Sequence, residues 1–169
     1  LGAWALDFAA AGNRGWVHSL GGLSITAVLR RFESALVTLA DPVGLVAAGV
    51  MGVKLGNVDA VAALVRWDAK ADVMWVASDG KAWRTAAAEF PLQGRYGQGV
   101  IACKPPLGVQ VVAAMIGKAS EGGLIKKKKL AARNVKIGDV PASKRGAKGT
   151  ELVPVKGGDS VVGFTPVPG

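Results

Sequence analysis

The chain has 169 residues, enough for one domain with its own hydrophobic core and too few for two ordinary ones. Half of the residues are hydrophobic, only 6% are aromatic and 24 are glycine, which favours many short strands joined by turns over long helices. The single cysteine excludes an internal disulfide and a cysteine-based zinc cluster, and no apolar stretch is long enough for a transmembrane helix. We therefore expect an all-β, cytoplasmic protein with no membrane partner.

The formal net charge of +9 favours a polyanionic partner, with nucleic acid as the first candidate. This charge is unevenly placed along the chain. Residues 1–117 hold ten basic and eight acidic side chains, whereas residues 118–169 hold eleven basic and four acidic ones. The last third of the chain therefore carries +7 of the net charge of +9.

A period of fifty residues organises the chain, because a glycine followed by a strand-like run begins at Gly49, Gly99 and Gly149. Residues 1–43 fit the period poorly, and no site is assigned to them. The second copy is the clearest. It reads as four strands at residues 73–78, 82–86, 100–104 and 110–116, with Asp79-Gly80 as a two-residue hairpin signal between the first two.

Four short strands in each unit predict a propeller-like β-pinwheel of about three four-stranded blades, in which each sheet packs against its neighbours. The predicted blades are residues 1–66, 67–117 and 118–169, all within one domain. Chance similarity among glycine- and valine-rich strands of a β-sandwich is the alternative.

Two loops at the same place in the repeat combine glycines with basic residues. Glycine lets the backbone approach a phosphate closely, while arginine and lysine supply charge and hydrogen-bond donors to phosphate oxygens. Solvated charge on an ordinary turn is the alternative. The candidate DNA-binding residues of these loops are Gln93, Arg95 and Gly97 in the second unit, and Lys144, Arg145 and Lys148 in the third.

The densest charge run is Lys126, Lys127, Lys128 and Lys129. Four adjacent lysines must point to both sides of a strand or loop, so some of them face solvent or a ligand. A solvated run that protects a sheet edge is one interpretation. We include all four lysines among the candidate DNA contacts, because other basic residues follow them closely in the sequence.

Little in the sequence predicts an enzyme. His18 is the single histidine, and a small hydrolase that uses it as a base is an alternative without any nucleophile motif to support it. No nucleotide-binding fingerprint or metal-ligand cluster is present, so we expect no catalytic residue, cofactor or metal. The tryptophans are expected to pack in the core or between blades, with stacking on single-stranded bases as the alternative.

The second copy resembles a blade of the C-terminal domain of the A subunit of bacterial DNA gyrase and topoisomerase IV. The resemblance lies in residues 82–104, above all in Glu89-Phe90-Pro91 and in the loop that leads to Gly99. Of the family heptad Q-R-R-G-G-K-G, the second copy keeps Gln93, Arg95, Gly97 and Gly99. The third copy keeps Arg145, Gly146, Lys148 and Gly149, with Lys144 in place of an arginine.

The resemblance implies a non-catalytic part of an ATP-dependent type II topoisomerase that binds, bends or wraps double-stranded DNA without sequence specificity. It also implies a bacterial, nucleoid-associated location and the catalytic core of the parent enzyme as a partner. Both heptads are incomplete, which leaves gyrase, topoisomerase IV and a paralogue open. Three units are half of a six-bladed disc, so a homodimer that closes a ring is a hypothesis. The alternative function is a β-propeller-like platform for protein interaction with a basic face.

Overall fold

A computed structural model describes residues 16–17, 25–30, 34–39, 50–51, 60–93 and 99–167, with side chains described from residue 60 onward except at 64 and 66. The candidates His18, Arg95 and Gly97 lie outside these ranges. The described strands before residue 90 are β1 (Trp16–Val17), β2 (Ile25–Arg30), β3 (Ser34–Leu39), β4 (Val50–Met51), β5 (Ala60–Arg66), β6 (Asp72–Ala77) and β7 (Lys81–Ala86). The later ones are β8 (Val100–Cys103), β9 (Val111–Gly117), β10 (Gly122–Lys127), β11 (Arg133–Lys136), β12 (Thr150–Glu151) and β13 (Val161–Val167). Two 3-10 turns, η1 (Ala87–Glu89) and η2 (Ile137–Asp139), follow β7 and β11.

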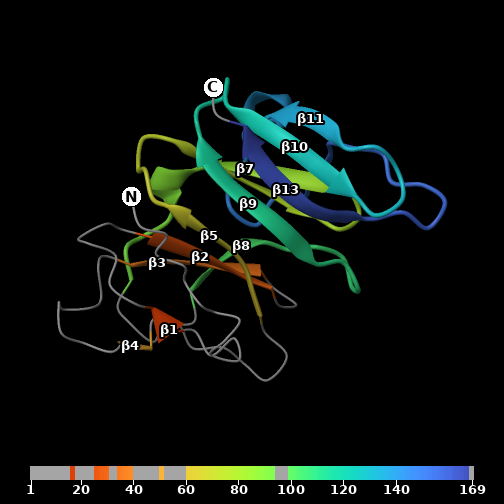
Figure 1. Cartoon of the computed structure of the whole chain (residues 1–169). Coiled ribbons are helices and arrows are strands. Elements are labelled where there is room, and N and C mark those ends of the chain that lie inside the picture. Colours follow the sequence, from red (N-terminus) through yellow and green to blue (C-terminus); the bar gives the residue numbers. More distant parts are fainter. Residues whose placement is uncertain are drawn as a thin grey trace.

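The described strands form antiparallel sheets that succeed one another across the molecule (Figure 1). The first sheet has the order β5-β2-β3-β8, the second β12-β7-β6-β9 and the third β11-β10-β13. A separate pair joins β1 to β4. Strand β9 lies against both β5 and β13, so these three strands form the inner side of the array. The predicted all-β, propeller-like fold class is therefore confirmed.

The strands of the second unit form within one or two residues of the predicted positions, but one of them belongs to a different sheet. Strand β8 pairs with β3 of the first sheet, and β12 of the third unit pairs with β7 of the second. Our interpretation of residues 100–104 as a strand of their own unit's sheet was wrong. Periodicity locates a strand, whereas its partner is decided by contacts between distant segments. Each of these units donates a short strand to the sheet before it, and the predicted blade boundaries stay a prediction.

The hairpin between β6 and β7 also differs in detail from the predicted two-residue turn. Three residues, 78–80, separate the strands. The amide of Gly80 donates to the carbonyl of Ala77 at 3.0 Å, and Gly80 has a φ of +82°. This left-handed conformation is the one that glycine adopts without a steric penalty.

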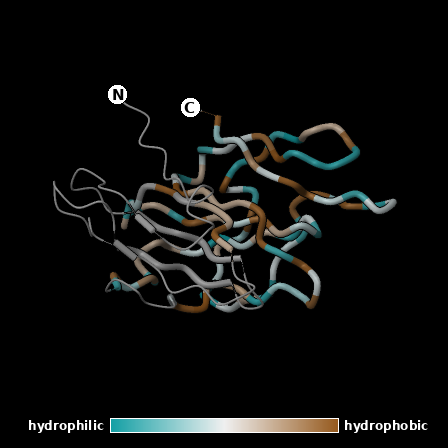
Figure 2. Tube along the Cα trace, turned by 60° about the horizontal axis from the view of Figure 1, so that its bottom comes forward, coloured by the Kyte–Doolittle hydropathy of each residue, from teal (hydrophilic) through white to brown (hydrophobic). Residues whose placement is uncertain are grey.

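The core consists of two apolar layers, one on each face of the second sheet. Strand β6 is buried at every position from Val73 to Ala77, because both of its faces are covered. Hydrophilic stretches lie mainly in the loops that project from the sheets (Figure 2). The layer towards the first sheet includes Val73, Trp75, Trp83, Phe90, Ala102, Cys103 and Val111. The layer towards the third sheet includes Met74, Val76, Met115, Ile125, Val135, Ile137 and Val161.

Candidate nucleic-acid interface

Residues 143–149, called the 143–149 loop below, cross the outer edge of two sheets. At the start of the loop, the amide of Ser143 donates to the carbonyl of Arg84 in β7 at 2.8 Å. Further along, the amide of Gly146 donates to the carbonyl of Ala102 in β8 at 2.9 Å. The chain then returns to the second sheet as β12. The loop is therefore fixed to the first and second sheets by its backbone, which leaves its side chains available for a ligand.

Trp83 forms the seat of this loop. Its indole Nε1 donates to the carbonyl of Ala147 at 2.9 Å, and its side chain is only 2% exposed. Gly149 lies directly on the same ring, since a Cβ built there would be 2.7 Å from Cζ2 of the indole. The loop can therefore pass this close to β7 only because residue 149 has no side chain.

Arg145 closes the far side of the loop. Its backbone amide donates to Oε2 of Glu89 at 3.2 Å, and its guanidinium lies 5.8 Å from the centroid of the Phe90 ring. Phe90 packs edge-on against Trp75, with ring centroids 5.6 Å apart. The segment that carried the family resemblance, Glu89-Phe90, therefore holds the loop of the following unit.

The basic side chains of the loop are exposed. Lys144, Arg145 and Lys148 are all exposed, although the Arg145 guanidinium lies over Phe90, and within the part of the chain that is described none of them forms an ion pair. By contrast, Arg84 under the loop pairs with Asp72 through Nη2 to Oδ2 at 2.7 Å. The cations of the loop are thus free to contact an anion, whereas the arginine beneath it is committed to structure.

The lysine run ends β10 and enters the turn towards β11. The amide of Lys128 donates to the carbonyl of Ser160 at 2.9 Å, and the amide of Lys129 donates to Oδ1 of Asp159 at 2.8 Å. The ammonium of Lys129 lies 3.3 Å from the carbonyl oxygen of Gly157. Lys126, Lys128 and Lys129 are exposed, while Lys127 is half-buried. The turn that precedes β13 therefore holds the lysine run in place.

Asp159 has an altered protonation equilibrium at the centre of this contact. Burial acts to raise the pKa of its carboxyl, but the backbone amides of Lys129, Ser160 and Leu130 and the charge of Lys127 together lower that pKa below its usual value. Its side chain is 8% exposed. The carboxylate of Asp159 therefore holds the backbone of the lysine run at Lys129.

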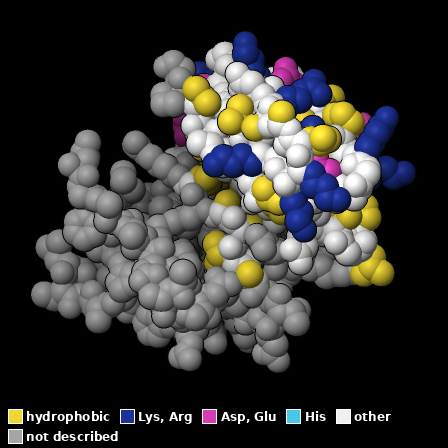
Figure 3. All heavy atoms as spheres, turned by 45° about the vertical axis from the view of Figure 1, so that its right-hand side comes forward, with side chains coloured by type: hydrophobic (Ala, Val, Ile, Leu, Met, Phe, Trp, Pro, Cys, Tyr) yellow, Lys and Arg dark blue, Asp and Glu magenta, His cyan; other side chains and the backbone are white. Residues whose placement is uncertain are grey.

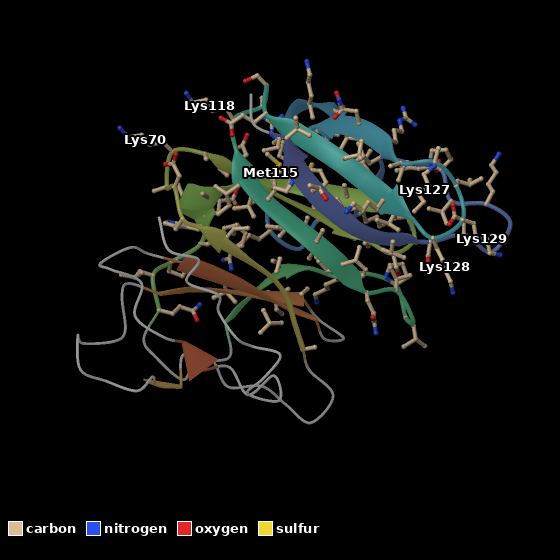
Figure 4. All side chains as sticks on the ribbon, in the orientation of Figure 1. Lys70, Met115, Lys118, Lys127, Lys128 and Lys129 are labelled. Atoms are coloured by element: carbon tan, nitrogen blue, oxygen red, sulfur yellow. The ribbon has the colours of Figure 1, made fainter. Side chains whose placement is uncertain are left out.

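Basic side chains are spread widely over the described face in Figure 3, with few acidic ones among them. Lys127, Lys128 and Lys129 lie at one end of the third sheet, far from Lys70 and Lys118 at the opposite end (Figure 4). The contacts of the described residues tie the 143–149 loop to β7, η1 and β8, and the lysine run to residues 157–160. No contact among these residues joins the two groups, so they form two separate basic surfaces.

Of the candidates in the second unit, only Gln93 is described, and it is half-buried just after η1. Sequence reasoning missed the residues that seat the loop, namely Trp83, Glu89 and Phe90. The fifty-residue period was a usable signal for them, because a loop that recurs in each unit has to pass over residues of a neighbouring unit. We had assigned the tryptophans to packing in the core or between blades, and the burial of Trp83 and Trp75 agrees with that.

No group of three or more His, Cys, Asp or Glu side chains among the described residues could hold a metal ion. A pocket of about 500 Å³ has acidic, basic and apolar lining residues. They are Trp67, Asp68, Ala71, Ile116, Gly117, Lys118 and Glu121. In the same ranges, no helix is both long and apolar enough to cross a bilayer.

The fold is a β-pinwheel of the propeller-like class. Its small sheets are stacked and receive strands from the following unit, and a loop that contains glycine and lysine crosses their outer edge. A family model described as "DNA gyrase C-terminal domain, beta-propeller" matches residues 72–118 and 134–168. These segments belong to that family, and the resemblance predicted from the sequence is confirmed.

Solved structures share this fold. The crystal structure of the C-terminal domain of DNA topoisomerase IV has a TM-score of 0.74 and 16% identity, over 89% of this chain and 48% of that one. The DNA gyrase A C-terminal domain has the same TM-score and 17% identity, over 85% and 51%. The E. coli ParC C-terminal domain has a TM-score of 0.62 and 17% identity, over 86% and 57%. The chain thus spans about half the length of these structures, and no curated protein sequence matches it.

Proposed function

We propose that this domain binds double-stranded DNA without sequence specificity and bends or wraps it, as part of the A subunit of a type II topoisomerase or a paralogue. The observation that carries the proposal is the 143–149 loop, in which exposed Lys144 and Lys148 have no acidic partner among the described residues. A loop of glycines and cations that is fixed by its backbone can bring its exposed lysines to phosphate oxygens, which are the same at every base pair.

The lysine run supplies a second contact in this mechanism. DNA that touches both basic surfaces has to follow the curved outer side of the array, and neutralised phosphates offset the cost of bending the duplex. If five to eight phosphates are contacted, the logarithm of the affinity falls against the logarithm of the salt concentration with a slope of roughly −4 to −7. A flat salt response would contradict this mechanism.

The wider context belongs to the same proposal. The domain performs no covalent chemistry, and the DNA it holds is presented to the catalytic core of the parent topoisomerase, which is ATP-dependent. The expected location is the bacterial cytoplasm, at the nucleoid. Two chains that close a six-bladed ring stay a prediction, and a monomeric mass in solution by light scattering would contradict it.

The decisive experiment compares two variants that change the net charge equally. In K144E/K148E two charges of the 143–149 loop are reversed, and in K70E/K118E two exposed lysines outside the loop and far from Lys127, Lys128 and Lys129 are reversed (Figure 4). We expect the loop variant to bind a random-sequence duplex at least tenfold more weakly than the control in fluorescence anisotropy at low salt. Plasmid relaxation in the presence of the unaltered chain measures trapped writhe.

Two outcomes would overturn the proposal. If the unaltered chain does not bind the duplex even at low salt, the protein-interaction platform becomes the better interpretation. If the loop variant and the control lose affinity equally, the binding reflects net charge alone and the 143–149 loop is not a site.

A further inference from the structure

The third sheet is covered on one face only in the described structure. In the second sheet, β6 is buried on both faces, whereas β10 of the third sheet alternates between buried and more exposed positions. Ile125 and Val135 point towards the second sheet and are 0% and 3% exposed. The opposite face, called the outer face below, has no sheet packed against it among the described residues.

The register of the strands places two lysines on this outer face. Gly122 of β10 pairs with Lys136 of β11, and residues directly opposite each other share a face of the sheet. Lys126 lies two pleats along β10 from Gly122 and therefore on the same side. The register places Gly122, Leu124, Lys126, Asn134, Lys136, Gly163, Thr165 and Val167 on this face, with no acidic residue.

The fifty-residue period allows this face to be compared with the matching face of the second sheet. Val76 and Met115 of the second sheet are 1% and 7% exposed, because the third sheet covers them. Their counterparts fifty residues later are Lys126 and Thr165, and both are exposed. A further blade or a second copy that packed in the same way would bury the ammonium of Lys126 without an acidic partner on this face, which is costly.

Lys136 is the second cation of the outer face. Its counterpart in the second sheet, Ala86, is exposed although the third sheet packs on that face, so Lys126 has a buried counterpart and Lys136 does not. The nearby carboxylate of Asp139 is engaged by the backbone, since the amide of Lys136 donates to its Oδ2 at 2.8 Å. Among the described residues, neither Lys126 nor Lys136 forms an ion pair.

We propose that the outer face of the third sheet is a further phosphate-contact surface for duplex DNA, with Lys126, the first residue of the lysine run, and Lys136 as its cations. Four residues of strand separate Lys126 from the position opposite Lys136, which is about 13 Å. That length spans about four base pairs of duplex, so both lysines can reach phosphates of the same molecule. This inference rests on the proposed function and adds a surface to it, because the duplex continues from the outer edge onto the outer face of the third sheet.

The test uses the whole chain and the charge-reversal variant K126E/K136E, with K70E/K118E as the control of equal charge. We expect K126E/K136E to bind the random-sequence duplex about tenfold or more weakly than the control, with a salt slope that is shallower by about 2. A second measurement avoids the need for any variant. Acetylation of lysines in the free and DNA-bound chain, read by mass spectrometry, should show Lys126 and Lys136 protected by DNA and Lys70 unprotected.

The outcomes separate this inference from the proposed function. If K144E/K148E loses affinity while K126E/K136E matches the control and its lysines stay reactive on DNA, the outer face is not a DNA surface and the proposed function stands. If the unaltered chain fails to bind the duplex, both fail. A third outcome concerns the chain without DNA. If the unaltered chain is a dimer whose Lys126 and Lys136 are protected from acetylation, and K126E/K136E is a monomer, a second copy occupies the face and our proposal is wrong.

Discussion

At the scale of single residues, Asp159 shows how one carboxylate positions a cationic turn. Because its folded-state pKa is lowered, the stabilisation that it provides is present above the unfolded value of about 3.9 and is lost as the pH falls through the folded value. We expect D159N to unfold at lower urea than the unaltered chain at pH 7, with the difference shrinking on acidification below pH 4. Exposed Asp68, as D68N, is the control. A difference between D159N and the unaltered chain that is independent of pH would contradict the role of the charge.

At the scale of the element, the 143–149 loop depends on its contact with Trp83. The variant G149A places a methyl group against the indole ring, and relief of that overlap should cost about 1–3 kcal/mol of unfolding free energy. DNA affinity should also fall, although no charge changes, because the loop moves off its seat. The control for stability is G163A, since a Cβ at Gly163 meets no atom within 4 Å. Near-ultraviolet circular dichroism reports on the indole environment, and an unchanged spectrum with unchanged affinity would contradict the seat.

At the scale of the whole molecule, the order of the sheets determines where a charge can lie. V76K places in the second sheet the residue type that the third sheet has at the matching position, Lys126. Because the new ammonium would be buried between two sheets, we expect the free energy of unfolding to fall by more than about 4 kcal/mol, or the variant not to fold. The reciprocal variant K126V changes an exposed position and should shift stability by no more than about 0.5 kcal/mol. Urea unfolding measures both. Equal effects from the two variants would contradict the stacked arrangement.

The sequence by itself determined the fold class, the strand positions of the second unit and the basic loop of the third. It could do so because strand-forming runs and turn glycines are local signals, and the fifty-residue period repeats them. The residues that built the family resemblance, among them Glu89 and Phe90, were also visible in the sequence, although their contact with Arg145 was not.

Only the tertiary structure decided which sheet each donated strand joins, what seats the loop and which face of the third sheet has no described sheet packed on it. The indole of Trp83 reaches Ala147 across 64 positions of sequence, and Arg145 reaches Glu89 across 56. Such pairings depend on which segments the fold brings together, and a periodic pattern is equally compatible with pairing inside a unit or between units. Lys126 illustrates the same limit, because the sequence shows a charge run but only the packing of one sheet on the next determines which of its lysines lies on an uncovered face.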